Sequence, residues 1–398
     1  MPVYSKDFKE FLRAHRTVDV HELLLAQSRY PEIDMAAAAQ QISGWQIARQ
    51  KLPLWAETEG ILFPPHLNME QCSSQWTAMY KSQIVAGGKS MTDLTAGFGV
   101  DATMLAQKYQ HLNYVERDAV LCDIAQNNLP LLGVTDFSLY PEEAAEVLRR
   151  LPHQDLIYID PARRGRHGQR VYALTDCTPD VTEMQDVLLE KADTVLLKLS
   201  PMLDVQVVMR SLKHITEVHI VSVNGECKEL LVKQNVSNIP TQFFCVNIKK
   251  EGRTDVFRFT SESEQTAVCH YADAVDKYLY EPNASLMKAA PFKRLAEKYG
   301  LLKISPISHL YTSNQLVEDF PGRIFQVENT LTLNKRDVKE KLAGLQQANI
   351  TVRNFPLTVA QLREKLKLKE GGRDYLFATT LKDGKHILIH STMYCKTT

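Results

Sequence analysis

Hydrophobic positions in the first 80 residues recur every three or four residues, which is the spacing of an amphipathic helix. Three segments carry this pattern: "DVHELLLAQ", "DMAAAAQQISGWQIARQKL" and "MEQCSSQWTAMYKSQIV". Asp34 and Ser73 stand where side chains that cap a helix N-terminus are expected. The pattern therefore predicts a helical N-terminal domain over residues 1–80.

From Met91 onward, short apolar runs alternate with helical segments. The runs predict seven strands: "MTDLTA", "LNYVE", "TDFSLY", "DLIYID", "TVLLKLS", "EVHIVSV" and "FFCVNI". Strands separated by helices are typical of a doubly wound, Rossmann-like α/β sheet. The last two runs lie close together, as an antiparallel edge pair would. We expect this sheet to occupy residues 81–274.

The pattern changes again near Tyr280, where "EPNASLMKAAPFKRLAEKYGL" predicts a helix and "RIFQVENTLTL" a strand. The rest of the chain predicts a helix, a strand, a helix and two strands that turn around residues 382–384. These elements indicate a small α+β C-terminal region. We divide it into residues 275–322 and residues 323–398.

Charge is balanced over the whole chain but not along it. The 398 residues hold 47 Lys and Arg against 47 Asp and Glu, so the molecule has no strong overall field for nucleic acid or membrane. Residues 281–398 hold 19 basic against 11 acidic residues, a net charge of +8 that leaves −8 for residues 1–280. The C-terminal third is the basic part.

Cysteine usage and the N-terminus bear on the compartment. Seven cysteines are scattered without a CxxC pair, which indicates reduced thiols and no metal site. The first 20 residues are charged throughout and lack the apolar core of a signal peptide, and no run approaches the roughly 20 apolar residues of a membrane span. We expect a cytoplasmic protein that binds neither metal nor membrane.

The stretch "DLTAGFG" joins a predicted strand to a predicted helix. It places Asp93 at the strand end, Gly97 and Gly99 in the turn, and Asp101 at the helix start. Glycines let backbone N–H groups approach a ligand closely, but acids on both sides of the turn would repel a pyrophosphate. The turn therefore suits S-adenosylmethionine, which carries an amino group and a sulfonium, better than a dinucleotide. A purely structural strand–turn–helix is the alternative.

Glu116 ends the second predicted strand, 17 residues after Gly99. An acid at about this distance from the glycine turn binds ribose hydroxyls in doubly wound folds. The alternative is a solvated side chain with no ligand.

The stretch "DLIYIDPARRG" is an apolar strand that ends in Asp160 and Pro161. Open α/β sheets bind ligands at the carboxyl ends of their strands. A carboxylate and a backbone carbonyl there could orient an exocyclic NH2 group toward a methyl sulfonium. Asp160 is thus the candidate catalytic residue, and its alternative role is that of a helix N-cap.

These motifs together resemble a class I S-adenosylmethionine-dependent methyltransferase. The chain is most similar to a family of bacterial methyltransferases with a THUMP-like C-terminal domain, and the likeness extends over "EQCSSQWTAMYK", "LLKLSPMLD", "SVNGECKEL", "YLYEPNASLMKA" and "NFPLTVAQLREKLKLKEGGRDYLFATT". The resemblance implies a small ferredoxin-like linking domain over residues 275–322 and a THUMP-like domain over residues 323–398. The "DLTAGFGVDA" and "ER" elements are also similar to a small-subunit rRNA guanine-N2 methyltransferase family.

The resemblance implies a role for each matched position. Cofactor contacts are expected from Asp93, Thr95, Ala96, Gly97, Gly99, Asp101, Glu116 and Arg117, and contacts with the target from Asp160 and Pro161. Further substrate contacts are expected from Arg163, Arg164, Lys198, Lys365 and Lys367. The expected activity is methylation of a base amino group in rRNA or tRNA, because THUMP domains accompany RNA-modifying enzymes.

Two departures keep other activities open. Base-amino methyltransferases often end this motif with an aromatic residue that stacks on the base, whereas here Ala162 and Arg163 follow Pro161. RNA uracil-C5 methyltransferases attack with a cysteine after the next strand, where this chain has Ser200, although Cys177 or Cys227 could reach the site.

The competing hypotheses are a small-molecule or protein methyltransferase and a non-catalytic RNA-binding protein, with an NAD-dependent oxidoreductase less favoured. No sequence feature specifies the substrate RNA or the oligomeric state.

Overall fold

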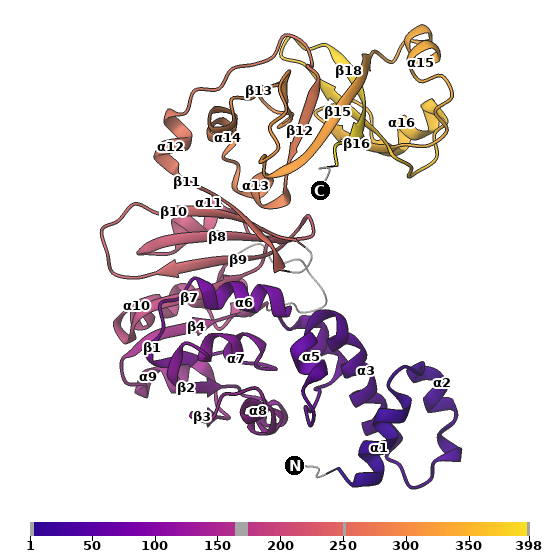
Figure 1. Cartoon of the computed structure of the whole chain (residues 1–398). Coiled ribbons are helices and arrows are strands. Elements are labelled where there is room, and N and C mark those ends of the chain that lie inside the picture. Colours follow the sequence, from indigo (N-terminus) through magenta and orange to yellow (C-terminus); the bar gives the residue numbers. More distant parts are fainter. Residues whose placement is uncertain (1–3, 164–173, 250–251, 396–398) are drawn as a thin grey trace. The chain divides into compact units, whose positions relative to one another are not determined.

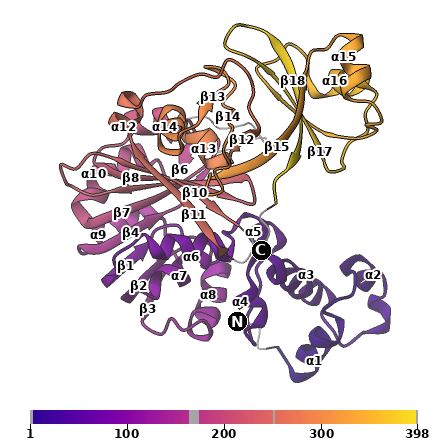
Figure 2. The ribbon, with the colours of Figure 1, turned by 45° about the horizontal axis from the view of Figure 1, so that its top comes forward.

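The computed structural model describes residues 4–163, 174–249 and 252–395. The chain divides into two compact units: residues 1–217 with 229–239 form unit 1, and residues 218–228 with 240–398 form unit 2. Figures 1 and 2 show the ribbon with its elements labelled. The α-helices of unit 1 are α1 (Lys6–His15), α2 (Val20–Leu25), α3 (Met35–Lys51), α4 (Pro53–Glu57), α5 (His66–Gln71), α6 (Gln75–Gln83), α7 (Val100–Ala106), α8 (Ala119–Leu131), α9 (Ala144–Arg150), α10 (Val181–Lys191) and α11 (Val205–Ser211).

The N-terminal segment is helical as its periodicity predicts. Asp34 caps α3, because its side chain accepts a hydrogen bond from the Ala37 N–H. The periodicity of the third segment predicts one helix, but the structure divides it into α5 and α6. The cap of α6 is Ser74 rather than Ser73, since the Ser74 hydroxyl accepts from the Thr77 N–H. Ser73 instead donates to a buried carboxylate.

The N-terminal helices contribute to two separate hydrophobic clusters. One lies within residues 8–42, where Phe8, Phe11 and Ile42 are buried together. The other combines Trp55 and Phe63 with side chains that follow the first strand, among them Phe98 and Val100. The helices that follow residue 47 therefore share a core with the glycine turn, which fixes the position of that turn.

A nine-stranded sheet has the order β11-β10-β8-β9-β7-β4-β1-β2-β3. Its strands are β1 (Gly88–Asp93), β2 (Tyr109–Val115), β3 (Phe137–Tyr140), β4 (Gln154–Ile159), β7 (Ala192–Leu199), β8 (Ile215–Val223), β9 (Glu226–Gln234), β10 (Gln242–Ile248) and β11 (Thr254–Thr260). Strands β3, β2, β1, β4 and β7 run parallel, and β9 is antiparallel to β7. A short separate ladder pairs β5 (Ala162–Arg163) with β6 (Cys177–Thr178). The order reverses between β1 and β4, and such a switch point is where open α/β sheets bind ligands.

All seven predicted strands of this region are present, which confirms the doubly wound α/β class. Two strands of this sheet, β9 and β11, were not predicted, and neither was the separate short pair β5 and β6. Strand β9 follows β8 through a two-residue turn at Asn224 and Gly225, which have φ values of 49° and 84°. An Asn-Gly pair between apolar runs is a strong hairpin signal, so the sequence did indicate β9. Strand β11 pairs with β10, so the predicted edge strand β10 is one place inside the edge.

Unit 2 contains a second sheet of seven strands in the order β13-β14-β12-β15-β18-β17-β16. Its strands are β12 (Tyr278–Pro282), β13 (Leu302–Lys303), β14 (Tyr311–Ser313), β15 (Gly322–Leu331), β16 (Asn349–Arg353), β17 (Asp374–Thr380) and β18 (His386–Met393), and its helices α12 (Ser261–Thr266), α13 (Ala284–Ala289), α14 (Phe292–Tyr299), α15 (Lys335–Lys341) and α16 (Val359–Leu366). The α+β prediction is confirmed. The single helix predicted after Tyr280 is two, because Ala290 adopts φ 60° ahead of Pro291.

One buried acid links the strands of this second sheet. Glu281 on β12 is 4% exposed and accepts from the Arg323 guanidinium on β15, which lies opposite it in register. The other carboxylate oxygen of Glu281 accepts from Arg353 on β16 at 3.1 Å. We call these three residues the Glu281 cluster. In Figure 2 the long strand β15 connects the part of the sheet that contains β12 to the part that contains β18 and β17.

Candidate active site

The glycine turn leaves β1 at the switch point of the sheet. Gly99 is the N-cap of α7 with φ 83°, and a Cβ there would meet the Tyr114 ring at 3.1 Å. Gly97 has φ 57°, and its nearest neighbour to an added Cβ is the Thr95 carbonyl oxygen at 4.0 Å. The Tyr114 hydroxyl donates to the Gly97 carbonyl at 2.6 Å. A side chain at position 99 would crowd the Tyr114 ring, so packing requires a glycine there. The space beside Gly97 is open, and a ligand could occupy it.

Glu116 lies beside this turn at the end of β2. Its Oε2 accepts from the Gly97 N–H at 2.9 Å and its Oε1 from the Asp118 N–H at 2.8 Å. Ala96 is buried and its N–H donates to the Val115 carbonyl, so the turn is held against β2. Arg117 is exposed and pairs with Glu143 at the surface. The structure therefore places Glu116, but not the Arg117 head group, against the glycine turn.

Asp93 is a buried acid at the carboxyl end of β1. It is 1% exposed, and one oxygen accepts from the Thr95 N–H at 2.9 Å. Burial raises the pKa of Asp93 well above its usual value, and the negative charges of Asp101, Asp160 and Glu116 raise it further. Several acids thus converge on the switch point, where they favour a positively charged ligand.

Asp160 follows β4, the strand next to β1. Its backbone N–H donates to the Thr95 hydroxyl at 2.7 Å, which ties this position directly to the glycine turn. Its side chain is 37% exposed, and Oδ2 accepts from Lys198 Nζ at 2.5 Å. Pro161 is buried. Arg163 lies on β5 opposite Cys177, while Arg164 falls outside the described residues.

Behind Asp160 lies a buried ion network, which we define as Lys81, Asp101, Lys198 and Glu229, with Asp160 as its exposed end. Lys81 Nζ donates to both oxygens of Glu229, at 2.9 and 2.7 Å, and lies 3.2 Å from Asp101 Oδ1. Lys198 Nζ lies 3.7 Å from Asp101 Oδ2. Side-chain exposure rises from 0% at Lys81 to 14% at Lys198. The network therefore leads from the core to Asp160.

The charges in this network are set by their neighbours. Burial opposes ionisation of Asp101, but Lys81 and Lys198, with hydrogen bonds from the Ser73 and Tyr158 hydroxyls, lower the pKa of Asp101 to about 2. Burial likewise opposes the charge on Lys198, yet Asp160 and Asp101 raise the pKa of its ammonium. Burial raises the pKa of Glu229, and Lys81 only partly offsets this. Asp101 and Lys198 are thus held as ions at neutral pH.

The network changes the interpretation of two predicted residues and adds others. Asp101 was predicted to contact the cofactor, but the structure engages its carboxylate with Lys81, Lys198, Ser73 and Tyr158. Lys198, predicted as a substrate contact, lies at the Asp160 carboxylate. Lys81 and Glu229 were not singled out, although the matched stretches "EQCSSQWTAMYK" and "SVNGECKEL" contain or adjoin them. No clear sequence signal marked Glu229, because Glu226 and Lys228 are charged neighbours on the same strand.

The other two predicted substrate residues lie in unit 2. Lys365 is in the last turn of α16, and Lys367 is its C-cap with φ 56°. Both side chains are exposed. A lysine in the last turn also complements the helix dipole, so these positions fit a surface role as well as RNA contact.

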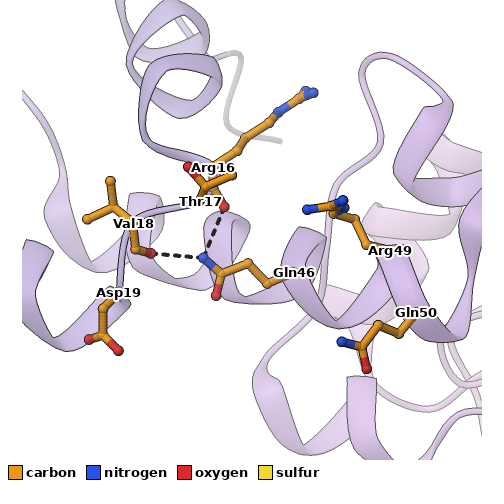
Figure 3. Close-up of a pocket in the computed structure, with 7 residues that line it drawn as sticks. All are labelled: Arg16, Thr17, Val18, Asp19, Gln46, Arg49 and Gln50. Carbon is orange, nitrogen blue, oxygen red and sulfur yellow. Dashed lines mark hydrogen bonds between the residues drawn. The ribbon is translucent and has the colours of Figure 1, made fainter.

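A pocket of about 540 Å³ opens among the N-terminal helices (Figure 3) and shares no residue with the predicted site. It is lined by Arg16, Thr17, Val18, Asp19, Gln46, Arg49 and Gln50, and the Gln46 amide donates to the Arg16 and Val18 carbonyls.

Within the described ranges, no group of three or more His, Cys, Asp or Glu side chains is placed to hold a metal ion. In the same part of the chain, no helix is both long and apolar enough to cross a bilayer.

Comparison with a solved structure identifies the family. The crystal structure of a putative methyltransferase from Porphyromonas gingivalis W83 matches with a TM-score of 0.87 and 35% sequence identity, over 98% of each chain. This chain belongs to the same family, the bacterial class I methyltransferases with a THUMP-like C-terminal domain. Residues 322–393 match the family described as THUMP domain-like, and residues 278–321 match a ferredoxin-like domain.

Other likenesses are remote. An rRNA methylase from Streptococcus thermophilus matches with a TM-score of 0.30 and 10% identity, over 41% of this chain and 95% of that one. TrmK from M. capricolum, solved with S-adenosyl-homocysteine, matches with a TM-score of 0.32 and 11% identity, over 41% and 68%. These values are too low to bear on function. No curated protein matches the chain at a significant level.

Proposed function

We propose that this methyltransferase uses S-adenosylmethionine as its methyl donor. The observation that carries the proposal is the set of acids around an open glycine turn, with Asp93, Glu116 and Asp160 at the carboxyl ends of β1, β2 and β4. A pyrophosphate would be repelled there, whereas a ligand with an amino group and a sulfonium would be attracted. The open space beside Gly97 fits a ligand that lies directly on the turn.

In this proposal, Asp93, Glu116 and Gly97 meet different parts of the cofactor. Asp93 is the partner of the amino group, because it is a buried acid at the carboxyl end of β1, where burial raises its pKa and a cation would favour its charged form. Glu116 is the acid for the ribose hydroxyls, and Gly97 provides the close approach. Thr95 and Ala96 shape the turn through their backbone contacts. The donor, when bound, supplies an electrophilic methyl group on a cationic sulfur.

We further propose RNA as the substrate. Support comes from the net charge of +8 in residues 281–398 and from the THUMP-like match, since such domains accompany RNA-modifying enzymes. A base amino group is the acceptor predicted from Asp160 and Pro161.

A cytoplasmic location is part of the proposal, supported by seven free cysteines. Within this scheme residues 1–80, 81–274, 275–322 and 323–398 are the proposed domains, and the two domain matches support the last two.

Calorimetry tests the cofactor assignment. We expect S-adenosylmethionine and S-adenosyl-homocysteine to bind with micromolar affinity, about −8 kcal/mol, and NAD not to bind. Gly97→Val should abolish binding, because the new side chain occupies the open space beside the turn. Gly300→Val is the matched control, since Gly300 has a similar φ of 62° and open surroundings but lies in unit 2. Binding of NAD without any response to S-adenosylmethionine would refute the proposal.

A further inference from the structure

The exposed end of the buried ion network consists of an ammonium and a carboxylate at neighbouring strand ends. Strands β4 and β7 are parallel, and their register pairs Ile159 with Leu197, so Asp160 and Lys198 emerge side by side at the carboxyl edge. The ion pair between them is 2.5 Å long. An atom that approaches Asp160 Oδ2 at this edge therefore also lies near the Lys198 ammonium.

Resting on the methyltransferase function proposed above, we propose that the methyl acceptor is a hydroxyl oxygen, the ribose 2′-hydroxyl of RNA, held between Lys198 and Asp160. This replaces the base amino group predicted from the sequence. An ammonium has three N–H donors and no acceptor. A hydroxyl can accept from Lys198 and donate to Asp160, whereas an exocyclic amino group would turn its own N–H donors toward the ammonium.

The charge that develops on the acceptor atom during methyl transfer also favours a hydroxyl over an amino group. An amine nitrogen becomes more positive as it attacks a methyl group, and a neighbouring ammonium raises the energy of that state. A hydroxyl oxygen becomes more negative as it loses its proton, and a fixed ammonium stabilises it. Lys198 suits this task because Asp160 and Asp101 raise the pKa of its ammonium, so that it stays charged.

The proposed step is an in-line displacement by the acceptor oxygen. The new O–C bond forms as the C–S bond of the methyl sulfonium donor breaks, and the electron pair of that bond remains on sulfur. The hydroxyl proton passes to the Asp160 carboxylate and from there to water, which its 37% exposed side chain can reach. Lys198 remains protonated throughout. Lys81, Asp101 and Glu229 do not contact the acceptor but position Lys198 from behind.

The position of the label in RNA tests the acceptor. The full-length protein is incubated with S-adenosylmethionine tritiated in the methyl group and total RNA from bacterial cells that lack this gene, and the RNA is then hydrolysed in alkali. A 2′-O-methyl group blocks cleavage of the next phosphodiester, so we expect the label in alkali-stable dinucleotides. Label in mononucleotides would place the methyl group on a base and overturn the inference while leaving the RNA methyltransferase function intact. If S-adenosyl-homocysteine binds but no RNA is labelled, the RNA function fails and the inference fails with it.

A substitution at Lys198 tests its role separately. Lys198→Met should lower transfer by about 10²–10³-fold, the loss expected when a donor to a developing oxyanion is removed. Its affinity for S-adenosyl-homocysteine, measured by calorimetry, should stay within about threefold of wild type, and Lys198→Arg should retain more transfer than Lys198→Met. Lys233→Met is the matched control, because Lys233 on β9 is 18% exposed, close to the 14% of Lys198, and forms an ion pair at 3.1 Å with Glu217 on β8. Wild-type transfer by Lys198→Met would overturn the inference, and if that variant does not fold, the label position in wild type decides.

Discussion

Each unit of the molecule contains a buried cluster of ions, and the two are built differently. The buried ion network of unit 1 uses lysines, and its deepest ammonium, that of Lys81, is fully buried. The Glu281 cluster of unit 2 uses arginines around one acid, and the side chains of Arg323 and Arg353 are 46% and 33% exposed. The first buries Lys81 together with two acids and reaches the surface at Asp160, whereas the second buries its one acid and exposes both of its cations.

The difference indicates what each cluster does. A guanidinium presents a planar fork of donors that suits a fixed bridge between strands. Arg323 donates to Glu281 through two nitrogens, and Arg353 through one. An ammonium is a compact charge whose effect depends on its neighbours, which suits a site where charge develops during a reaction. We infer that the Glu281 cluster holds a sheet together, while the buried ion network prepares Lys198 and Asp160.

Removal of the most deeply buried cation should have the largest effect on stability. Lys81→Met leaves the carboxylates of Glu229 and Asp101 buried without their nearest cation, which should lower the free energy of unfolding by about 3–5 kcal/mol. Glu281→Gln should lower it by only about 1–2 kcal/mol, because the two arginines can turn to water. Urea denaturation of both variants measures the contrast.

A double variant provides the control for that comparison. Adding Glu229→Gln to Lys81→Met should recover part of the lost stability, since it removes one of the unpaired charges. Equal losses for Lys81→Met and Glu281→Gln would show that the two clusters do not differ in the way proposed.

Asp160, the exposed end of the network, should affect catalysis and not stability. Asp160→Ala should lower methyl transfer by about 10²-fold or more while cofactor affinity stays nearly unchanged, because a positioning group for the acceptor is lost. Asp160→Asn should be no milder if the acceptor is a hydroxyl, since an amide accepts a hydrogen bond but cannot take the proton, and milder if the acceptor is a base amino group that needs only orientation. Asp193→Ala, at an exposed acid that pairs with His153, serves as the control. If Asp160→Ala transferred the tritiated methyl group to RNA as fast as wild type, Asp160 would be removed from the mechanism.

Acid should destabilise unit 1 through Asp101. Its pKa falls from 3.8 to about 2 on folding, so its stabilising charge is fully present above pH 4 and is lost as the pH falls toward 2. The loss should amount to about 2 kcal/mol. Asp101→Asn should lack this part of the acid transition, which denaturant titrations at pH 4 and pH 2 would measure. Glu229 affects stability in a different pH range. Burial raises its pKa, so folding favours its protonated form, and this contribution to stability is lost as the pH rises.

The smallest expected effect concerns the surface of unit 2. If Lys365 and Lys367 contact phosphates, Lys365→Gln with Lys367→Asn should weaken RNA binding and reduce the log-log salt slope by about 1.4 for single strands. Asn is chosen at position 367 because it tolerates the positive φ found there. Lys6→Gln with Lys9→Gln on α1 is the charge-matched control. An unchanged slope would mean that these two lysines only complete the end of α16.

The sequence predicted the elements of the fold better than the partners of its charges. Periodicity located the seven strands and the helical N-terminus, because burial on one face leaves a regular mark on the chain. It also located the acid ends of β1, β2 and β4, since strand ends in an α/β sheet meet at one edge. It did not show that Lys81 and Glu229, 148 residues apart, form a bidentate ion pair. Such a contact depends on how the strands are ordered, and the order followed only once β9 was found between β7 and β8.

The pairing of β12 with β15 has a consequence for any attempt to dissect this chain. The two regions that match separate domain families, residues 278–321 and 322–393, contribute adjacent strands to one sheet. A chain cut at residue 321 would lose β15 and leave the backbone N–H and C=O groups of β12 without their ladder on that side. An uncovered strand edge readily pairs with another chain, so such a fragment should aggregate. The THUMP-like segment is therefore better exchanged as a whole sheet, together with residues 278–321, than removed at the boundary between the two matches.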